Sequence, residues 1–140
     1  MLNNIFIEEI IKLAKIAYDM DEVPVGAIVV CNGKIIGRGY NNRENTHFIT
    51  GHAEIMAINE ACLYKNDWRL DDCDLYVTLK PCMMCSGAIK ESRINNVFYL
   101  CDRTNVCSTV ADSSFSIIDD VENKNIYINL LQLFFENRRI

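Results

Sequence analysis

The sequence predicts an α/β fold, a three-layer α/β/α sandwich around a central mixed sheet. Segments with helical periodicity alternate with short β-branched apolar segments, in the order helix, strand, strand, helix, strand, helix, strand. Strands joined through a helix favour parallel neighbours, whereas strands joined by a tight turn pair antiparallel, so one sheet should contain both kinds of pairing. With 140 residues, half of them hydrophobic, we expect a single domain over residues 1–140.

The first elements are an amphipathic helix and a hairpin. Apolar residues recur at helical spacing over residues 5–18, and Asn4 is placed to cap that helix. The segments VGAIVV and KIIGRGY are apolar and rich in β-branched residues, and Asn32-Gly33 between them suits a tight turn with positive φ angles. These two segments are therefore predicted to pair as neighbouring strands.

The next elements alternate between helix and strand. Residues 41–51 are polar and turn-forming, and HAEIMAINEACLY then returns to helix formers with an apolar stripe. DLYVTL is typical of a short buried strand, Pro81 marks the start of the helix that contains CMMCSGAIKES, and NNVFYL is a further strand. Residues 101–120 show no clear pattern, and residues 125–139 predict a closing helix.

The composition limits the compartment and the partners of the protein. The formal net charge is −5 and the pI about 5.0, so overall charge does not hold nucleic acid and any polynucleotide contact must be local. The seven cysteines are odd in number and no signal peptide precedes them, which indicates a reducing cytosol. No apolar run approaches the ~18 residues that span a bilayer. We therefore expect a soluble, cytoplasmic protein with no membrane partner.

Two cysteines and one histidine form the strongest candidate for a metal site. Cys82 and Cys85 stand three residues apart at the start of a predicted helix, so both sulfurs lie on one face of it. The helix N-terminus also favours the thiolate form that a metal requires. His52 and Glu54 open a different helix. Because residues two apart in mid-helix point roughly 200° away from each other, these two converge only at the helix entry.

This set of residues is what hydrolytic zinc chemistry needs. Three protein ligands leave the fourth tetrahedral position for a water molecule, whose pKa zinc lowers to about 7. A carboxylate beside the metal, here Glu54, relays protons during attack on an amino-bearing ring carbon. Two alternatives are a redox C-x-x-C pair and a structural zinc site that a fourth ligand closes. By residue type, the candidates for that fourth ligand are His47, Cys73, Cys101 and Cys107.

Around these residues the chain resembles a known family. H-x-E followed by P-C-x-x-C is the signature of zinc-dependent nucleobase deaminases. From about residue 23 to 100 the sequence is similar to tRNA-specific adenosine deaminases, which convert adenosine at the anticodon wobble position to inosine. The stretches that carry the resemblance are VPVGAIVV, GYNN, GHAEIMAI, LYVTLKPCMMCSGAI and SRI. It implies a cytidine deaminase-like fold, Zn2+ as cofactor, a homodimer, and a tRNA anticodon stem-loop as partner.

The resemblance also implies roles for single residues. It makes His52, Cys82 and Cys85 the zinc ligands and Glu54 the proton carrier. The substrate-binding residues that it implies are Asn41, Val25 and Ala53. At the C-terminal end it implies RNA contacts for Phe134, Phe135, Arg138 and Arg139. Without the resemblance, Asn41 is an ordinary turn residue, the two aromatic residues pack into the core, and the two arginines favour a helix C-terminus.

The segment CDRTNVCSTVADSSF, from residue 101 to 115, departs from the family, which usually carries Asp, Lys and several glycines there beside the bound RNA. Two further hypotheses therefore stand beside wobble adenosine deamination. One is a deaminase of free bases or nucleosides of the guanine or cytosine type, and the other is a non-catalytic zinc-binding subunit. The cysteines outside the metal motif are expected only to pack: Cys31, Cys62, Cys73, Cys101 and Cys107.

Overall fold

The computed structural model describes residues 2–103 and 114–137, and these form a mixed α/β structure around one five-stranded sheet. In chain order the elements are α1 (Leu2–Asp19), β1 (Gly26–Cys31), β2 (Lys34–Tyr40), α2 (Arg43–Thr46), α3 (Ala53–Lys65), β3 (Cys73–Leu79), α4 (Met83–Ser92), β4 (Asn96–Cys101), β5 (Phe115–Ile117) and α5 (Val121–Asn137). None of the described helices is long and apolar enough to cross a membrane.

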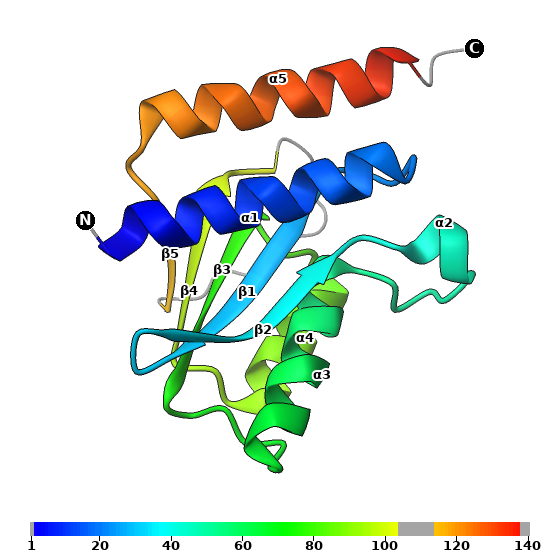
Figure 1. The fold of residues 1–140 in the computed structure, drawn as a ribbon. Coiled ribbons are helices and arrows are strands. Elements are labelled where there is room, and N and C mark those ends of the chain that lie inside the picture. Colours follow the sequence, from blue (N-terminus) through cyan, green and yellow to red (C-terminus); the bar gives the residue numbers. More distant parts are fainter. Residues whose placement is uncertain (1, 104–113, 138–140) are drawn as a thin grey trace.

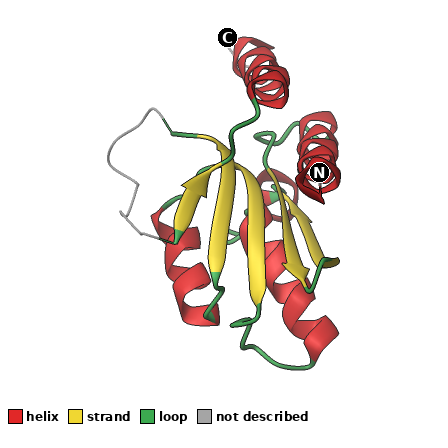
Figure 2. Ribbon diagram, turned by 90° about the vertical axis from the view of Figure 1, so that its left-hand side faces the viewer, coloured by secondary structure: helices red, strands yellow, loops and turns green. Residues whose placement is uncertain are grey.

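The sheet has the order β2-β1-β3-β4-β5 and both kinds of pairing. β1 pairs antiparallel with β2 and with β3, whereas β3, β4 and β5 are parallel neighbours. Figure 2 shows these strands side by side in one twisted sheet. The β1–β2 turn is formed by Asn32 and Gly33, both with positive φ angles of 51° and 77°. The predicted hairpin and mixed sheet are confirmed.

Helices cover both faces of the sheet, which confirms the predicted three-layer sandwich. α1 lies across one face with α5 beside it, and α3 and α4 lie on the opposite face (Figure 1). Successive side chains of a strand point to opposite faces, and the core divides accordingly. On β1, Ile28 and Val30 pack with side chains of α1, whereas Ala27 and Val29 face the small residues of α3.

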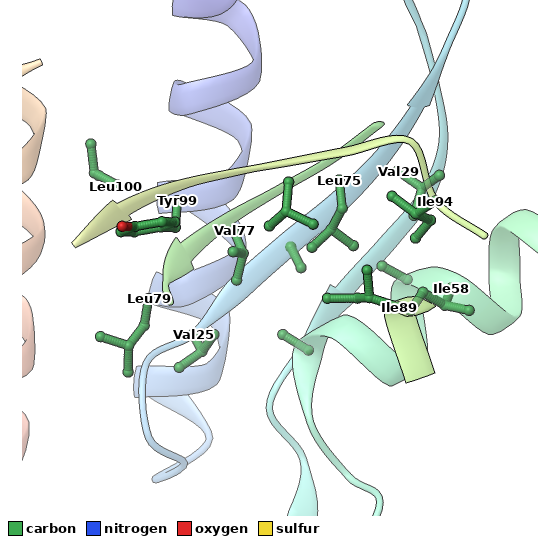
Figure 3. Close-up of a cluster of buried hydrophobic side chains, with 14 of the residues drawn as sticks. Val25, Val29, Ile58, Leu75, Val77, Leu79, Ile89, Ile94, Tyr99 and Leu100 are labelled. Atoms are coloured by element: carbon green, nitrogen blue, oxygen red, sulfur yellow. The ribbon is translucent and has the colours of Figure 1, made fainter. Parts of the chain in front are cut away.

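The larger apolar cluster fills the space between the sheet and the helices α3 and α4, and it extends to side chains of α1 and α5. Figure 3 shows Val29, Leu75 and Val77 from the strands close to Ile58 and Ile89 from these helices. Such burial stabilises the fold by about 25 cal/mol per Å² of apolar surface removed from water. The cluster therefore holds α3 and α4 firmly against the sheet, and these are the two helices that open with the candidate metal ligands.

The structure differs from the predicted elements in three places. α1 begins at Leu2, so Asn4 lies within the first turn of the helix and the prediction that it caps the helix is wrong. The polar stretch 41–51 contains the short helix α2, which ends at His47 in a left-handed conformation. The unclear region contains β5, only three residues long, which depends on pairing with β4 rather than on a pattern of its own.

Candidate functional site

The N-termini of α3 and α4 bring the predicted metal-binding residues together. His52 is the N-cap residue of α3, Cys82 is the N-cap residue of α4, and Cys85 lies in the first turn of α4. The His52 Nδ1 atom lies 3.6 Å from the Cys82 Sγ atom and 3.4 Å from the Cys85 Sγ atom. The Cys85 side chain is fully buried, and His52 and Cys82 are half-buried. Both helices therefore begin on one compact group of donor atoms.

The spacing of these donors fits a tetrahedral zinc ion. Zinc–sulfur and zinc–nitrogen bonds of about 2.3 and 2.0 Å at tetrahedral angles put a sulfur and a nitrogen ligand roughly 3.5 Å apart. The three donor atoms lie within 4.8 Å of one another, and no fourth His, Cys, Asp or Glu of the described chain joins them. His47, Cys73 and Cys101 are thus outside the cluster, and Cys107 lies outside the described residues.

The two thiols of the cluster hold their protons differently. Hydrogen bonds from the Cys85 thiol and the His52 ring lower the pKa of Cys82 to about 3, against the opposing effect of burial. The pKa of Cys85 is raised, because its hydrogen bond with Cys82 and its burial both favour the protonated thiol. These interactions favour loss of the Cys82 proton before that of Cys85, and a metal that binds both sulfurs displaces the thiol protons that remain.

Glu54 lies beside this cluster in the first turn of α3. Its side chain is 2% exposed, and burial raises its pKa. The carboxyl group lies within hydrogen-bonding reach of the Cys85 thiol and feels the positive charge of Arg103. Arg103 in turn donates from Nε to the carbonyl of Lys80 at 2.6 Å, which fixes the chain just before Pro81 and Cys82. A buried carboxyl with a raised pKa can both accept and donate a proton near neutral pH.

A cleft of about 1070 Å³ opens over the cluster. His52, Glu54 and Cys82 line it together with Val25 and Asn41, for which the family resemblance implied contacts with the substrate. One wall comes from α5 through Ile128, Leu131, Gln132, Phe134, Phe135 and Glu136. Ala53 does not line this cleft; its side chain is fully buried under β2. The volume suits a nucleoside-sized ligand with some of its flanking groups.

Asn41 performs a structural task at the edge of the cleft. Its Oδ1 atom accepts a hydrogen bond of 2.8 Å from the backbone N–H of Ala53, the first residue of α3. His52 occupies the N-cap position but makes no side-chain capping bond, so Asn41 supplies the cap from a distant part of the chain. The Asn41 Nδ2 group donates no hydrogen bond to another described residue, so it remains a donor for a ligand in the cleft.

Sequence reasoning missed Glu22, a buried carboxylate in the cleft wall. Glu22 is 2% exposed, and its two oxygens accept hydrogen bonds from the backbone N–H groups of Glu44 and Asn45 and from the Asn45 side chain, at 3.1, 2.8 and 2.6 Å. It thereby fixes α2 and the segment that carries Asn41. No spacing signal could have identified it, since its partners lie more than twenty residues further along the chain.

The residues predicted to contact RNA at the C-terminal end lie in different environments. Phe134 is buried at 4% exposure and packs edge-to-face against Tyr18 and Phe135. Phe135 is 53% exposed at the rim of the cleft. Arg138 and Arg139 lie outside the described residues. Of the two aromatic rings, only that of Phe135 offers an open face to a base.

Residues 2–101 match the family described as the cytidine and deoxycytidylate deaminase zinc-binding region. The chain belongs to this family. That membership makes it a zinc-dependent hydrolytic deaminase, and the His52, Cys82 and Cys85 cluster supplies a donor set for that metal. It also disfavours the alternative of a redox C-x-x-C pair.

Relatives of this deaminase include tRNA-specific adenosine deaminases and a guanine deaminase. The tRNA-specific adenosine deaminase of Streptococcus pyogenes serotype M18 is 39% identical, over 96% of this chain and 90% of the relative. A solved structure from a study of A-to-I editing by tRNA:A34 deaminases superposes with a TM-score of 0.74 at 32% identity, covering 83% of this chain and 98% of that one. Guanine deaminase from Bacillus subtilis gives a TM-score of 0.68 at 38% identity, with coverages of 72% and 65%. The predicted resemblance to tRNA-specific adenosine deaminases is confirmed.

Proposed function

We propose that this deaminase converts adenosine to inosine at the wobble position of a tRNA anticodon by hydrolysis, releasing ammonia. The observation that carries the proposal is the convergence of His52, Cys82, Cys85 and Glu54 on one open cleft. Similarity to tRNA-specific adenosine deaminases over nearly the full length of this chain and of a relative supports the choice of substrate. We assign the activity to a single domain over residues 1–140.

The metal and the acid have separate tasks in this proposal. His52, Cys82 and Cys85 hold the zinc ion, which supplies Lewis-acid activation of a water molecule when it is bound. Glu54 takes one proton from the attacking water and delivers it to N1 of the adenine ring. It then takes the second proton, from the hydroxyl group now on C6, and gives it to the amino group as the C6–N bond breaks. Burial suits Glu54 to this shuttle, because its raised pKa brings the two protonation states closer in energy near neutral pH.

The cleft walls position the base. The Asn41 Nδ2 group donates to an acceptor of the base or ribose, and Val25 forms an apolar surface beside it. Ala53 contributes through its backbone N–H bond to Asn41 rather than through its side chain. The exposed ring of Phe135 offers a stacking surface to the anticodon loop, and Arg138 and Arg139 follow it in the sequence with charges that can pair with phosphates.

We also propose a homodimer in the cytoplasm. Large apolar side chains are exposed just before α3 and at the start of α4, where Phe48, Ile49 and Met83 are 66, 76 and 60% exposed. Such surfaces are typical of association sites, and a second copy of the chain would cover them. The described cysteines form no disulfide, which fits a reducing compartment.

Free-base deamination is the second candidate function. The 38% identity to a guanine deaminase favours it, and the cleft itself does not discriminate between a free purine and a flipped base. The test incubates the zinc-loaded protein with a minimal anticodon stem-loop and, separately, with guanine, cytosine, adenosine and cytidine. Inosine in the stem-loop alone supports the proposal, whereas ammonia from a free base alone replaces it. No turnover on any substrate, with one bound zinc per chain, would indicate a non-catalytic zinc-binding subunit.

The role of Glu54 has its own test. Glu54→Gln keeps the shape of the side chain but removes the proton carrier, so turnover should fall by about 10²–10⁴-fold, equivalent to roughly 2.7–5.5 kcal/mol of activation free energy. Zinc content should stay at one per chain, because the variant leaves the three donors intact. Glu91→Gln, an exposed position on α4, is the matched control. Full activity of Glu54→Gln would remove the proposed mechanism.

A further inference from the structure

Two cysteines far from the metal cluster face each other across neighbouring strands. Cys31 ends β1 and Cys73 begins β3, and the two are direct partners in the antiparallel register. Cys73 is fully buried, and Cys31 is half-buried. β3 continues from Cys73 to Leu79 before it reaches the metal cluster, so the pair lies about 20 Å from that cluster at 3.3 Å per residue. This pair is separate from the candidate catalytic site.

The backbone around the pair has the geometry that a cross-strand disulfide needs. The Cys73 N–H donates to the carbonyl of Leu70 at 3.0 Å, and the Cys73 carbonyl accepts from the N–H of Asn95 at 2.9 Å. In a hydrogen-bonded antiparallel pair these groups would bond to the opposite residue, so Cys31 and Cys73 form a non-hydrogen-bonded pair. Opposite Cα atoms in such a pair are about 4.5 Å apart, within the roughly 4.4–6.8 Å seen in disulfides.

The two sulfur atoms are already side by side. Cys31 and Cys73 are within hydrogen-bonding reach of each other, and the Sγ atoms also lie 3.5 and 3.4 Å from the two carboxylate oxygens of Asp72. Burial and these neighbours raise the pKa of Cys73, so the buried sulfur of the pair keeps its proton until Cys31 has reacted. Lys65 forms an ion pair with Asp72, which places a positive charge beside the group.

We propose that Cys31 and Cys73 form a reversible disulfide when the protein meets a small-molecule disulfide as oxidant. The half-exposed Cys31 sulfur attacks one sulfur of the oxidant, forming a mixed disulfide and releasing the first small thiol. The Cys73 sulfur then attacks the Cys31 sulfur, forming the cross-link and releasing the second small thiol. The two protein thiols are oxidised, the small disulfide is reduced to two thiols, and the two protons leave with these products.

Burial assigns the order of these two steps. Only Cys31 is accessible to an oxidant, and Cys73 reaches the mixed disulfide from inside the fold without exposure to solvent. The resulting cross-link ties β1 to β3 and closes a loop of about forty residues, which stabilises the folded state by restricting the unfolded chain. Because the pair lies at the far end of the sheet, zinc binding and catalysis should be unaffected. This inference does not depend on the proposed function.

The experiment treats the zinc-loaded protein of 140 residues with oxidised glutathione, blocks remaining thiols by alkylation, and maps disulfides by mass spectrometry. We expect a peptide pair that joins Cys31 to Cys73, a loss of two hydrogen atoms from the intact mass, and one zinc retained per chain. The melting temperature should rise by roughly 5–10 °C and return to its original value after reduction.

Three variants make the result specific. Cys73→Ser should leave glutathione attached to Cys31, because no second thiol displaces it, and its melting temperature should not rise on oxidation. Cys31→Ser should form no cross-link, whereas Cys62→Ser should behave like the unmodified sequence. A lasting glutathione adduct on Cys31 without a cross-link in the unmodified protein would overturn the proposal. A second zinc per chain that disappears in Cys31→Ser would overturn it too, by making the pair a metal site.

Discussion

Replacing Gly39 with alanine should disturb the metal cluster from a distance. Gly39 lies in β2 beneath the first turn of α3, and a Cβ atom there would come 2.0 Å from the carbonyl oxygen of Ala53 and 2.7 Å from the backbone nitrogen of Ala57. In folded proteins, Cβ atoms essentially never lie closer than 3.0 Å to a non-bonded heavy atom. Gly39→Ala therefore pushes the start of α3 away from the sheet by about 1 Å.

The displacement acts on His52 and Glu54, because these residues are rigidly attached to the first turn of α3. Cys82 and Cys85 stay in place on α4, so the metal-binding residues separate from each other. A misplacement of about 1 Å can cost about 10²-fold in rate. Overpacking should also destabilise the fold by about 1–3 kcal/mol, which lowers the melting temperature of a chain of this size by roughly 3–10 °C.

Thermal unfolding measures the loss of stability. Zinc content after dialysis measures the loss of metal binding, and ammonia release from the anticodon stem-loop measures the loss of activity. Gly87→Ala is the control: apart from the adjacent backbone of its own helix, a Cβ atom there meets no described atom within 4 Å. Alanine in the exposed part of α4 should stabilise the protein by about 0.5–1 kcal/mol. Gly37→Ala contacts α3 one turn further from His52, so it should destabilise the fold with a smaller loss of zinc. A Gly39→Ala protein with normal melting temperature, zinc content and activity would refute the reasoning.

Two further predictions concern Asn41 and Asp72. Asn41→Ala removes the cap of α3 and should lower stability by about 0.5–2 kcal/mol, whereas Asn41→Asp keeps the capping oxygen and should lose activity without that loss of stability; equal melting temperatures for both variants would contradict the capping role. The Lys65 ammonium and the Cys73 thiol lower the pKa of Asp72 to about 2, so Asp72 adds stability above about pH 4 that is lost as the pH falls toward 2. Between pH 5 and pH 3, the free energy of unfolding measured with urea should fall more steeply for the unmodified protein than for Asp72→Asn. The difference should be small, because solvent screens this exposed ion pair with Lys65. Identical slopes for the two proteins would exclude the contribution of Asp72.

The sequence alone was sufficient to predict the features that depend on residues close together in the chain. The hairpin depends on Asn32 and Gly33, which adopt the positive φ angles that such a turn requires. The metal cluster depends on short spacings at two helix starts, so His52, Cys82 and Cys85 could be named before their distances were known. The turn and each half of the metal motif have causes within a few residues along the chain, whereas the expectation that the two halves meet, thirty residues apart, came from the family resemblance.

Features that depend on distant contacts could not be predicted. Glu22 acts on Glu44 and Asn45 across a stretch of chain with no shared pattern. The pairing of Cys31 with Cys73 requires the register between β1 and β3, which about forty residues separate. A pattern of period two shows which face of a strand is buried, but it does not say which residue of another strand lies opposite. Packing of the whole domain decides that.

The hydrogen bond from Ala53 to Asn41 limits how the substrate preference of this protein can evolve. The Asn41 side chain lines the cleft, and its amide oxygen caps the helix that begins beside His52, so an exchange at position 41 that removes this oxygen alters the cleft and the metal site together. α5 also borders the cleft, but it carries none of the residues of the metal cluster, so exchanges in α5 can change the cleft without changing the metal site. New specificities should therefore accumulate along α5, while position 41 stays constant.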